Sequence, residues 1–275
     1  MAGAAARRAR LDAEMVRRRL APSRSAAQGL IAAGEVTVQG IAQPRAASQV
    51  TPGQHIEIVS TAPRFASRGG LKLSGALDDL AVDPTGLLAL DAGAAHGGFT
   101  DVLLRRGAAH VIAVDVAYGQ LAWHLRTDER VTLLERTNVR HLTSGALGGR
   151  RPELVVADLS FISLGKVLPA LAAVTSEDAA LLPMVKPQFE AGPTRVGKGG
   201  VVRDPTVWAE ACHAVIASAA QLGFTLHGVV PSQAPGPAGN IEFFLLLRRG
   251  IAGAAGDPSA LIADATAAGQ ALAGR

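Results

Sequence analysis

Several short apolar runs in the second half of this chain are each followed, or interrupted, by a charged residue. The runs and their charged residues are 154–157 with Asp158, 181–185 with Lys186, and 240–244 with Glu242. A strand that is buried on both faces has no reason to end in a charge unless its end lines a crevice, and open α/β sheets bind ligands at the carboxyl ends of their strands. The runs therefore predict an α/β fold with a ligand site at one edge of a mostly parallel sheet.

A fourth charged residue, Lys72, lies in the segment 70–80, whose apolar residues recur at helical spacing. Strand ends can simply tolerate a charge, and for any one of the four residues that interpretation is preferable. All four residues together with a glycine-rich loop favour a site, because a Lys-Asp-Lys-Glu set is suited to methylating a ribose hydroxyl. We therefore predict a catalytic tetrad of Lys72, Asp158, Lys186 and Glu242.

The glycine-rich loop follows the apolar run 87–90 and precedes a segment with helical spacing, 100–106. A strand, a glycine loop and a helix in this order let the backbone approach a ligand, with helix N–H groups directed at it. A dinucleotide fingerprint needs Gly-x-Gly-x-x-Gly. This loop has glycines only at 93, 97 and 98, so alanines fill the stretch where a pyrophosphate would be admitted.

An acidic residue follows each of the two apolar runs around the loop. Asp91 would meet an ammonium group, and Asp115 falls about 20 residues beyond the loop, where a carboxylate takes the ribose hydroxyls of a bound nucleoside. These acids favour S-adenosylmethionine over a nicotinamide dinucleotide as the cofactor. The predicted cofactor-binding residues are Asp91, Gly93, Ala94, His96, Gly97, Gly98, Phe99, Asp115, Asn138 and Asp158.

Composition narrows the classes of protein that remain. A length of 275 residues with 48% apolar residues allows one large core and a small appendage. The single cysteine, Cys212, excludes intramolecular disulfides and a cysteine-cluster zinc site, and it suits the cytoplasm. No apolar stretch reaches the ~20 residues of a membrane span, and the N-terminus lacks the apolar part of a secretory signal. We expect no metal and no membrane association.

Basic residues are concentrated at the N-terminus. The net charge is only +4, but seven arginines fall within the first 24 residues. Leu11, Met15 or Val16, and Leu20 recur there at helical spacing and leave arginines on the other face. A solvated arginine face is the common explanation, whereas clustering on a small module favours sequence-independent contacts with RNA phosphates. Aromatic residues make up 4% of the chain, so recognition of folded RNA by shape fits better than base stacking, and no DNA partner is expected. The predicted RNA-binding residues are Arg7, Arg10, Arg17, Arg18, Arg19, Arg24 and Arg68.

The order of the predicted elements indicates two domains. Residues 1–60 form a small α+β RNA-binding domain of two helices and short strands, 61–67 a linker, and 68–250 the cofactor-binding domain. In the second domain strands alternate with helices until 224–230 and 241–247, which form a hairpin and give a mostly parallel sheet one antiparallel edge strand. The Ala- and Gly-rich tail, 251–275, is expected to be poorly ordered.

Longer motifs make a family resemblance specific. The chain resembles the TlyA (hemolysin A) family of ribosomal-RNA 2′-O-methyltransferases over roughly residues 7 to 249, with an N-terminal domain like that of a small-subunit ribosomal protein and an FtsJ-like methyltransferase domain. The motifs that carry this resemblance are Ser67-Arg68-Gly69-Gly70-Leu71-Lys72-Leu73, Asp158-Leu159-Ser160-Phe161-Ile162-Ser163-Leu164, Val185-Lys186-Pro187-Gln188-Phe189-Glu190 and Gly239-Asn240-Ile241-Glu242. The chain departs from the family's usual residues at Ala95-His96 and Phe65-Ala66.

The resemblance implies a Rossmann-like class I methyltransferase sheet, the same catalytic tetrad, and a cytidine in small- and large-subunit ribosomal RNA as the target. Methyl transfer requires alignment of the two reactants and stabilisation of a developing alkoxide. A neutral Lys186 could accept the hydroxyl proton, and a charged one would stabilise the oxyanion; both roles stay open. The alternatives are a non-catalytic RNA-binding or ribosome-assembly factor and, less favoured without a membrane-spanning segment, a hemolysin.

Overall fold

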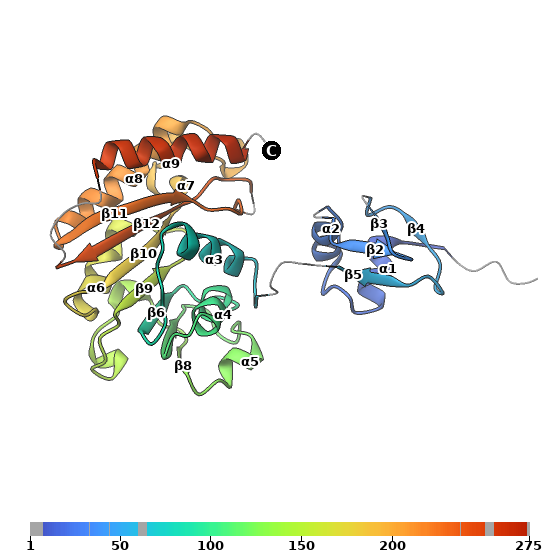
Figure 1. The fold of residues 1–275 in the computed structure, drawn as a ribbon, viewed down its shortest axis with the longest axis horizontal. Helices are drawn as coiled ribbons and strands as arrows, with labels where there is room; N and C mark the ends of the chain where they lie inside the picture. The colour runs from blue at the N-terminus through green and yellow to red at the C-terminus, as the bar shows by residue number, and fades with distance from the viewer. Residues whose placement is uncertain are drawn as a thin grey trace, which may run out of the picture. The chain divides into compact units, whose positions relative to one another are not determined.

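The computed structural model describes residues 8–32, 34–43, 45–59, 65–236, 238–250 and 256–273. The chain divides between residues 64 and 65 into two compact units, which are described separately (Figure 1). Among the described residues, no helix is both long and apolar enough to cross a membrane.

The first unit is a small α+β fold with its own core. Its elements are β1 (Ala9–Arg10), α1 (Leu11–Arg17), α2 (Arg24–Ala32), β2 (Val36–Val38), β3 (Ile41–Ala42), β4 (Gln49–Val50) and β5 (Ile56–Ile58). Strand β2 pairs with β3 and β5, and β1 pairs with β4, in each case antiparallel. Leu11 and Met15 on α1 pack against Ile31 on α2 and Val36 on β2, so the helical spacing found in the sequence marks the buried face.

The second unit is built on a seven-stranded sheet. Its strands are β6 (Leu88–Ala92), β7 (His110–Val114), β8 (Val131–Leu134), β9 (Leu154–Ala157), β10 (Ala180–Val185), β11 (Phe224–Pro231) and β12 (Phe243–Arg249), in the spatial order β11-β12-β10-β9-β6-β7-β8. Strands β8, β7, β6, β9 and β10 are parallel. The hairpin β11–β12 adds the antiparallel strand β12 at the β10 side, with β11 outermost. The predicted α/β class is confirmed.

Helices cover both faces of this sheet (Figure 1). One core contains residues of α3 (Gly69–Asp79), α4 (Gly98–Arg105) and α5 (Trp123–Arg126). The opposite core contains residues of α6 (Leu168–Val174), α8 (Pro205–Ala220) and α9 (Pro258–Ala273). Alternate strand residues enter alternate cores, as the twofold repeat of a strand requires: Phe244 packs with α3 and α4, whereas Phe243 packs with α8 and α9.

The expectation of a poorly ordered tail was wrong for residues 256–273. Helix α9 buries Ile262, Ala265 and Thr266 and packs against β11 and α8. A Cβ atom on Gly269 would lie 3.1 Å from Ile241 and 3.3 Å from the ring of Phe243. The small side chains that make this stretch resemble a linker therefore let the helix lie close to the sheet.

Candidate active site

Three residues of the predicted tetrad meet at one edge of the sheet. Asp158 follows β9 and Lys186 follows β10, while Glu242 immediately precedes the antiparallel strand β12. Residues Val185 and Phe243 are paired across β10 and β12, so Lys186 and Glu242 are the next positions beyond that pair. By the alternation of side chains, all three face the side of the sheet that α3 covers.

The tetrad is arranged as two ion pairs. Lys72 on α3 places its Nζ 2.5 Å from Glu242 Oε2, and Lys186 places its Nζ 2.5 Å from Asp158 Oδ1. Lys72, Lys186 and Glu242 are buried, whereas the Asp158 side chain is 25% exposed. Lys186 also donates to Ser160 Oγ at 3.1 Å. Each buried cation thus has a carboxylate partner, and Asp158 is the tetrad member that faces the neighbouring pocket.

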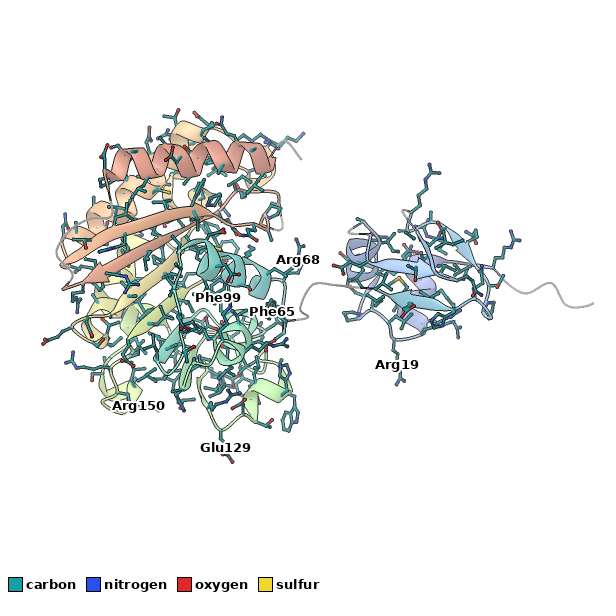
Figure 2. The ribbon with its side chains drawn as sticks, viewed as in Figure 1. Arg19, Phe65, Arg68, Phe99, Glu129 and Arg150 are labelled. Atoms are coloured by element: carbon teal, nitrogen blue, oxygen red, sulfur yellow. The ribbon has the colours of Figure 1, made fainter. Side chains whose placement is uncertain are left out.

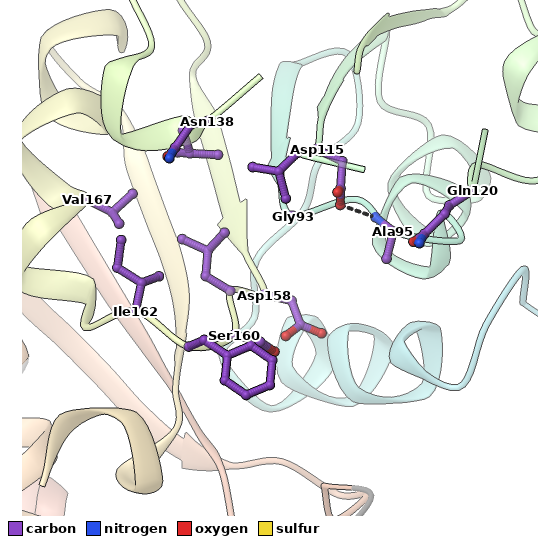
Figure 3. A pocket seen from close by; sticks show the side chains of 13 residues that line it. Gly93, Ala95, Asp115, Gln120, Asn138, Asp158, Ser160, Ile162 and Val167 are labelled. Atoms are coloured by element: carbon purple, nitrogen blue, oxygen red, sulfur yellow. Dashed lines mark hydrogen bonds between the residues drawn. The ribbon is translucent and has the colours of Figure 1, made fainter. Parts of the chain in front are cut away.

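A pocket of about 450 Å³ opens beside Asp158 (Figure 3). This volume lies within the range of small-molecule sites. Four of the predicted cofactor residues line it: Gly93, Asp115, Asn138 and Asp158. The two oxygens of Asp115 accept backbone N–H groups from Ala95 and Ala117, each at 2.7 Å. A carboxylate has about four lone-pair positions, so both Asp115 oxygens can accept a further donor from a ligand.

Each of the three loop glycines is required by a close approach to a different part of the chain. Gly93 has φ +91°, and a Cβ atom there would lie 2.4 Å from the carbonyl oxygen of Asp158. At Gly97 and Gly98 a Cβ would meet Leu125 at 2.3 Å and Ser67 at 2.2 Å. Gly93 therefore lets the loop approach the end of β9 at the pocket, whereas Gly97 and Gly98 serve packing against neighbouring segments and do not line the pocket.

The other predicted cofactor residues lie outside the pocket lining. Asp91 is fully buried beneath the loop, where its Oδ2 accepts from Thr100 Oγ1 at 2.6 Å. Ala94 is buried, and His96 is exposed. Phe99 is a core residue, with its ring centroid 5.9 Å from that of Phe244 (Figure 2).

Burial dominates the environment of Asp91 and raises the pKa of its carboxyl to about 7. Its Oδ1 is buried without a hydrogen-bond partner in the described part of the chain. Such a group favours either a proton or a nearby cation.

Sequence reasoning missed a wall of the pocket. Ser160, Phe161 and Ile162 line it, and Phe161 is 91% exposed with φ +63°. These residues belong to the motif that follows Asp158, but nothing in their spacing marks them as a pocket wall. An exposed aromatic at the opening of the pocket can stack on a base.

The predicted RNA-binding arginines have diverse environments. Arg10 and Arg24 donate to the buried carboxylate of Asp12, and Arg17 and Arg18 donate to Glu14. These contacts hold the pKa of both carboxyls well below their usual range. The exposed remainder of Arg10, Arg17 and Arg24 can still meet a phosphate.

Arg18 and Arg19 differ most, although they are adjacent. Arg18 is 21% exposed and also donates to the carbonyls of Thr51, Pro52 and Gln54, so it ties α1 to the turn before β5. Arg19 is exposed and points away from its unit (Figure 2). Arg68 is exposed at the start of α3, and Arg7 lies outside the described residues.

Arg18 and Arg19 allow a matched test of structural and RNA-binding roles within the N-terminal unit. Arg18→Ala should lower the free energy of unfolding by about 2 kcal/mol, because charged hydrogen bonds to carbonyls are lost. Arg19→Ala should leave thermal unfolding unchanged and, if Arg19 contacts a phosphate, reduce the slope of log affinity for RNA against log salt by about 1. Thermal denaturation and RNA binding at several salt concentrations measure both. An unchanged slope for Arg19→Ala would identify it as a solvated side chain.

Comparisons with known proteins agree with this geometry. The family described as FtsJ-like methyltransferase matches residues 65–249, and the S4 domain matches residues 9–56. The 16S/23S rRNA (cytidine-2′-O)-methyltransferase TlyA of Mycobacterium tuberculosis is 55% identical over 244 residues, which are 88% of this chain and 91% of the relative.

Two solved structures are also similar. A hemolysin candidate from Streptococcus thermophilus aligns with a TM-score of 0.77 and 33% identity over 98% of both chains. An S-adenosylmethionine-dependent methyltransferase candidate from Listeria monocytogenes, at 12% identity, shares the fold alone, with a TM-score of 0.50 over 67% of this chain and 100% of the other. S-Adenosylmethionine is the cofactor of the FtsJ-like methyltransferase family. The chain belongs to the TlyA (hemolysin A) family of ribosomal-RNA 2′-O-methyltransferases, with an S4 domain followed by an FtsJ-like methyltransferase domain.

Proposed function

We propose that this protein methylates the 2′-hydroxyl of a cytidine ribose in ribosomal RNA, within the cytoplasm and on RNA or assembled ribosomal subunits. The observation that carries the proposal is the placement of the Asp158–Lys186 pair, 2.5 Å apart, with Asp158 in the lining of a pocket of cofactor size. RNA as the substrate class is supported by the presence of an S4 domain before the FtsJ-like domain in this chain, and by the name of the M. tuberculosis relative.

The residues of the pocket fit S-adenosylmethionine. Asp115 and Asn138 offer hydrogen-bonding groups for a nucleoside, and Gly93 keeps the loop close to Asp158 without a side chain in between. Asp91 lies outside the pocket lining, and its orphaned, buried Oδ1 favours either a proton or a nearby cation. When bound, the cofactor supplies a methyl group on a sulfonium centre.

The lysines act through their hydrogen-bond donors. As an ammonium, Lys186 has three N–H donors, of which Asp158 and Ser160 take two. We assign the third donor to the ribose oxygen, where it stabilises the negative charge that develops as the methyl group is transferred and the hydroxyl proton passes to water. Glu242 holds the ammonium of Lys72, and Asp158 holds that of Lys186. Both cations are therefore fixed before the substrate arrives.

The contribution of Asp115 is testable by a single change. Asp115→Asn replaces one acceptor oxygen by an amide N–H₂, which would face the N–H of Ala95 or Ala117. We expect cofactor affinity to fall about tenfold or more, since a backbone donor is left unpaired and a ribose acceptor is lost. Calorimetry with S-adenosylhomocysteine measures this loss. Glu129→Gln, which removes an exposed carboxylate that does not line the pocket, is the control (Figure 2).

The function itself is tested by methyl transfer from labelled S-adenosylmethionine to small- and large-subunit RNA, both deproteinised and assembled. Nucleoside analysis of the product should give 2′-O-methylcytidine. Methylation of a base, or of another ribose, would overturn the assignment of the target. Cofactor and RNA binding without any methyl transfer would favour the non-catalytic assembly factor, and lysis of erythrocytes by the purified protein without RNA methylation would favour a hemolysin.

A further inference from the structure

The pocket wall after Asp158 has an unusual backbone. Phe161 is not glycine, yet its φ is +63°, a conformation that costs free energy for a side chain of this size. Such a conformation persists only where the surroundings fix it. Ser160 and Ile162, on either side of Phe161, line the pocket together with it, so whatever fixes the segment also fixes the shape of the pocket.

Several contacts to this wall come from one short segment, Lys186 and the following helix α7 (Pro187–Glu190). Lys186 donates to Ser160, and the rings of Phe161 and Phe189 have centroids 5.2 Å apart. The carboxylate of Glu190 accepts from Ser163 Oγ at 2.7 Å and from the backbone N–H of Leu164 at 2.8 Å. The two segments that carry Asp158 and Lys186 are therefore joined a second time, at Glu190.

Glu190 is half-buried and has no cationic partner in the described part of the chain. The titratable group that faces it is the buried thiol of Cys212 on α8, whose pKa is raised to about 12 by burial and by the charge of Glu190. A half-buried carboxylate without a cation is costly unless it is hydrogen-bonded, and here two donors satisfy it. Glu190 does not line the pocket, so it has no direct contact with the reacting atoms.

We propose that Glu190 is a positioning residue for methyl transfer. By binding Ser163 and Leu164, it holds the wall segment against the strand end that carries Lys186. The wall then keeps Asp158 at the pocket and within 2.5 Å of Lys186. The plainer explanation is that Glu190 only caps the short 3₁₀ helix Leu164–Lys166 and contributes to stability. The two explanations differ in what happens to the site when the carboxylate is removed from a folded protein.

Two substitutions separate these explanations. Glu190→Ala removes both acceptors. Glu190→Gln keeps both contacts, because its oxygen can accept from Leu164 and its N–H₂ can donate to Ser163 Oγ. We expect the alanine variant to lose about tenfold or more in kcat, the effect of a small misplacement of reacting groups, and the glutamine variant to retain near-normal kcat. The loss in kcat should exceed any change in KM for RNA, since Glu190 itself does not line the pocket.

This inference rests on the proposed methyl transfer. A second measurement, of cofactor affinity, is therefore needed that does not require an RNA substrate. S-Adenosylhomocysteine affinity, measured by calorimetry, should weaken severalfold in Glu190→Ala and stay unchanged in Glu190→Gln, because the wall segment lines the pocket. If the wild-type protein methylated no RNA, the proposed function would fail while this affinity pattern still tested the positioning role. Glu210→Ala, an exposed glutamate on α8, is the control for loss of a carboxylate.

Thermal denaturation establishes that the variants are compared as folded proteins. The inference is overturned if folded Glu190→Ala keeps wild-type kcat and cofactor affinity, which would leave only a stabilising role. It is also overturned if Glu190→Gln loses as much activity as Glu190→Ala, because that result would mean that the negative charge matters and the two contacts do not.

Discussion

Replacing Lys186 with alanine is expected to lower kcat for methyl transfer by about 10² or more, the usual scale for loss of a catalytic proton-transfer or charge-stabilising group. Cofactor affinity should change little, since Lys186 is absent from the pocket lining and reaches it through its side-chain contacts with Asp158 and Ser160. Single-turnover methyl transfer and calorimetry measure the two quantities separately. Lys198→Ala, which removes an exposed lysine, is the control.

A second variant, Lys186→Arg, distinguishes the two roles that the sequence leaves open. Arginine stays charged and donates hydrogen bonds, but it cannot accept a proton. Partial recovery of kcat in this variant, relative to Lys186→Ala, would support stabilisation of the oxyanion. Activity as low as that of the alanine variant, in a folded protein with intact cofactor affinity, would support proton acceptance by a neutral lysine. Near-normal turnover of Lys186→Ala would remove Lys186 from catalysis.

The buried pair Lys72–Glu242 should give the largest effect on stability. Glu242→Ala leaves the Lys72 ammonium, 7% exposed, without its carboxylate. Removal of one partner of a buried ion pair lowers the free energy of unfolding by about 3–5 kcal/mol. Chemical denaturation of the variant measures this loss, and methyl transfer should be lost as well.

A double variant separates stability from catalysis. Lys72→Met combined with Glu242→Leu replaces the two charges by apolar side chains of similar size, which is often neutral for stability. We expect the double variant to unfold near the wild-type midpoint and to remain inactive. If it regained methyl transfer, the pair would be purely structural. If Glu242→Ala alone unfolded like the wild type, Lys72 would have to be solvated.

The position of the candidate site could be predicted because it depends on local patterns. Apolar runs mark the strands β9 and β10, and the charge after each run marks the sheet edge where the strands end. Glu242 was found by the same rule, although its strand is antiparallel, since the start of such a strand lies at the same edge. The pairing of Lys72 with Glu242, 170 residues apart, needs the tertiary structure.

The roles of the loop residues could not be predicted, because they depend on partners distant in sequence. Position 98 must be glycine because a side chain there would clash with Ser67, which lies in the segment before α3. Phe99 packs its ring against that of Phe244 on β12. A glycine-rich loop looks the same whether its glycines face a ligand or another segment. The arginines show the same limit: Arg18 and Arg19 are equivalent in sequence, yet one binds main-chain carbonyls around residue 52 and the other is exposed.

Helix α9 has a practical consequence for work with this protein. The FtsJ-like match ends at residue 249, but Pro258–Ala273 covers the face of the hairpin that holds Ile241 and Phe243. A shortened chain that ended after β12 would expose this apolar strip beside the outermost strand β11, and exposed apolar surface next to a free strand edge promotes aggregation. Domain boundaries for expression should therefore be drawn after residue 273.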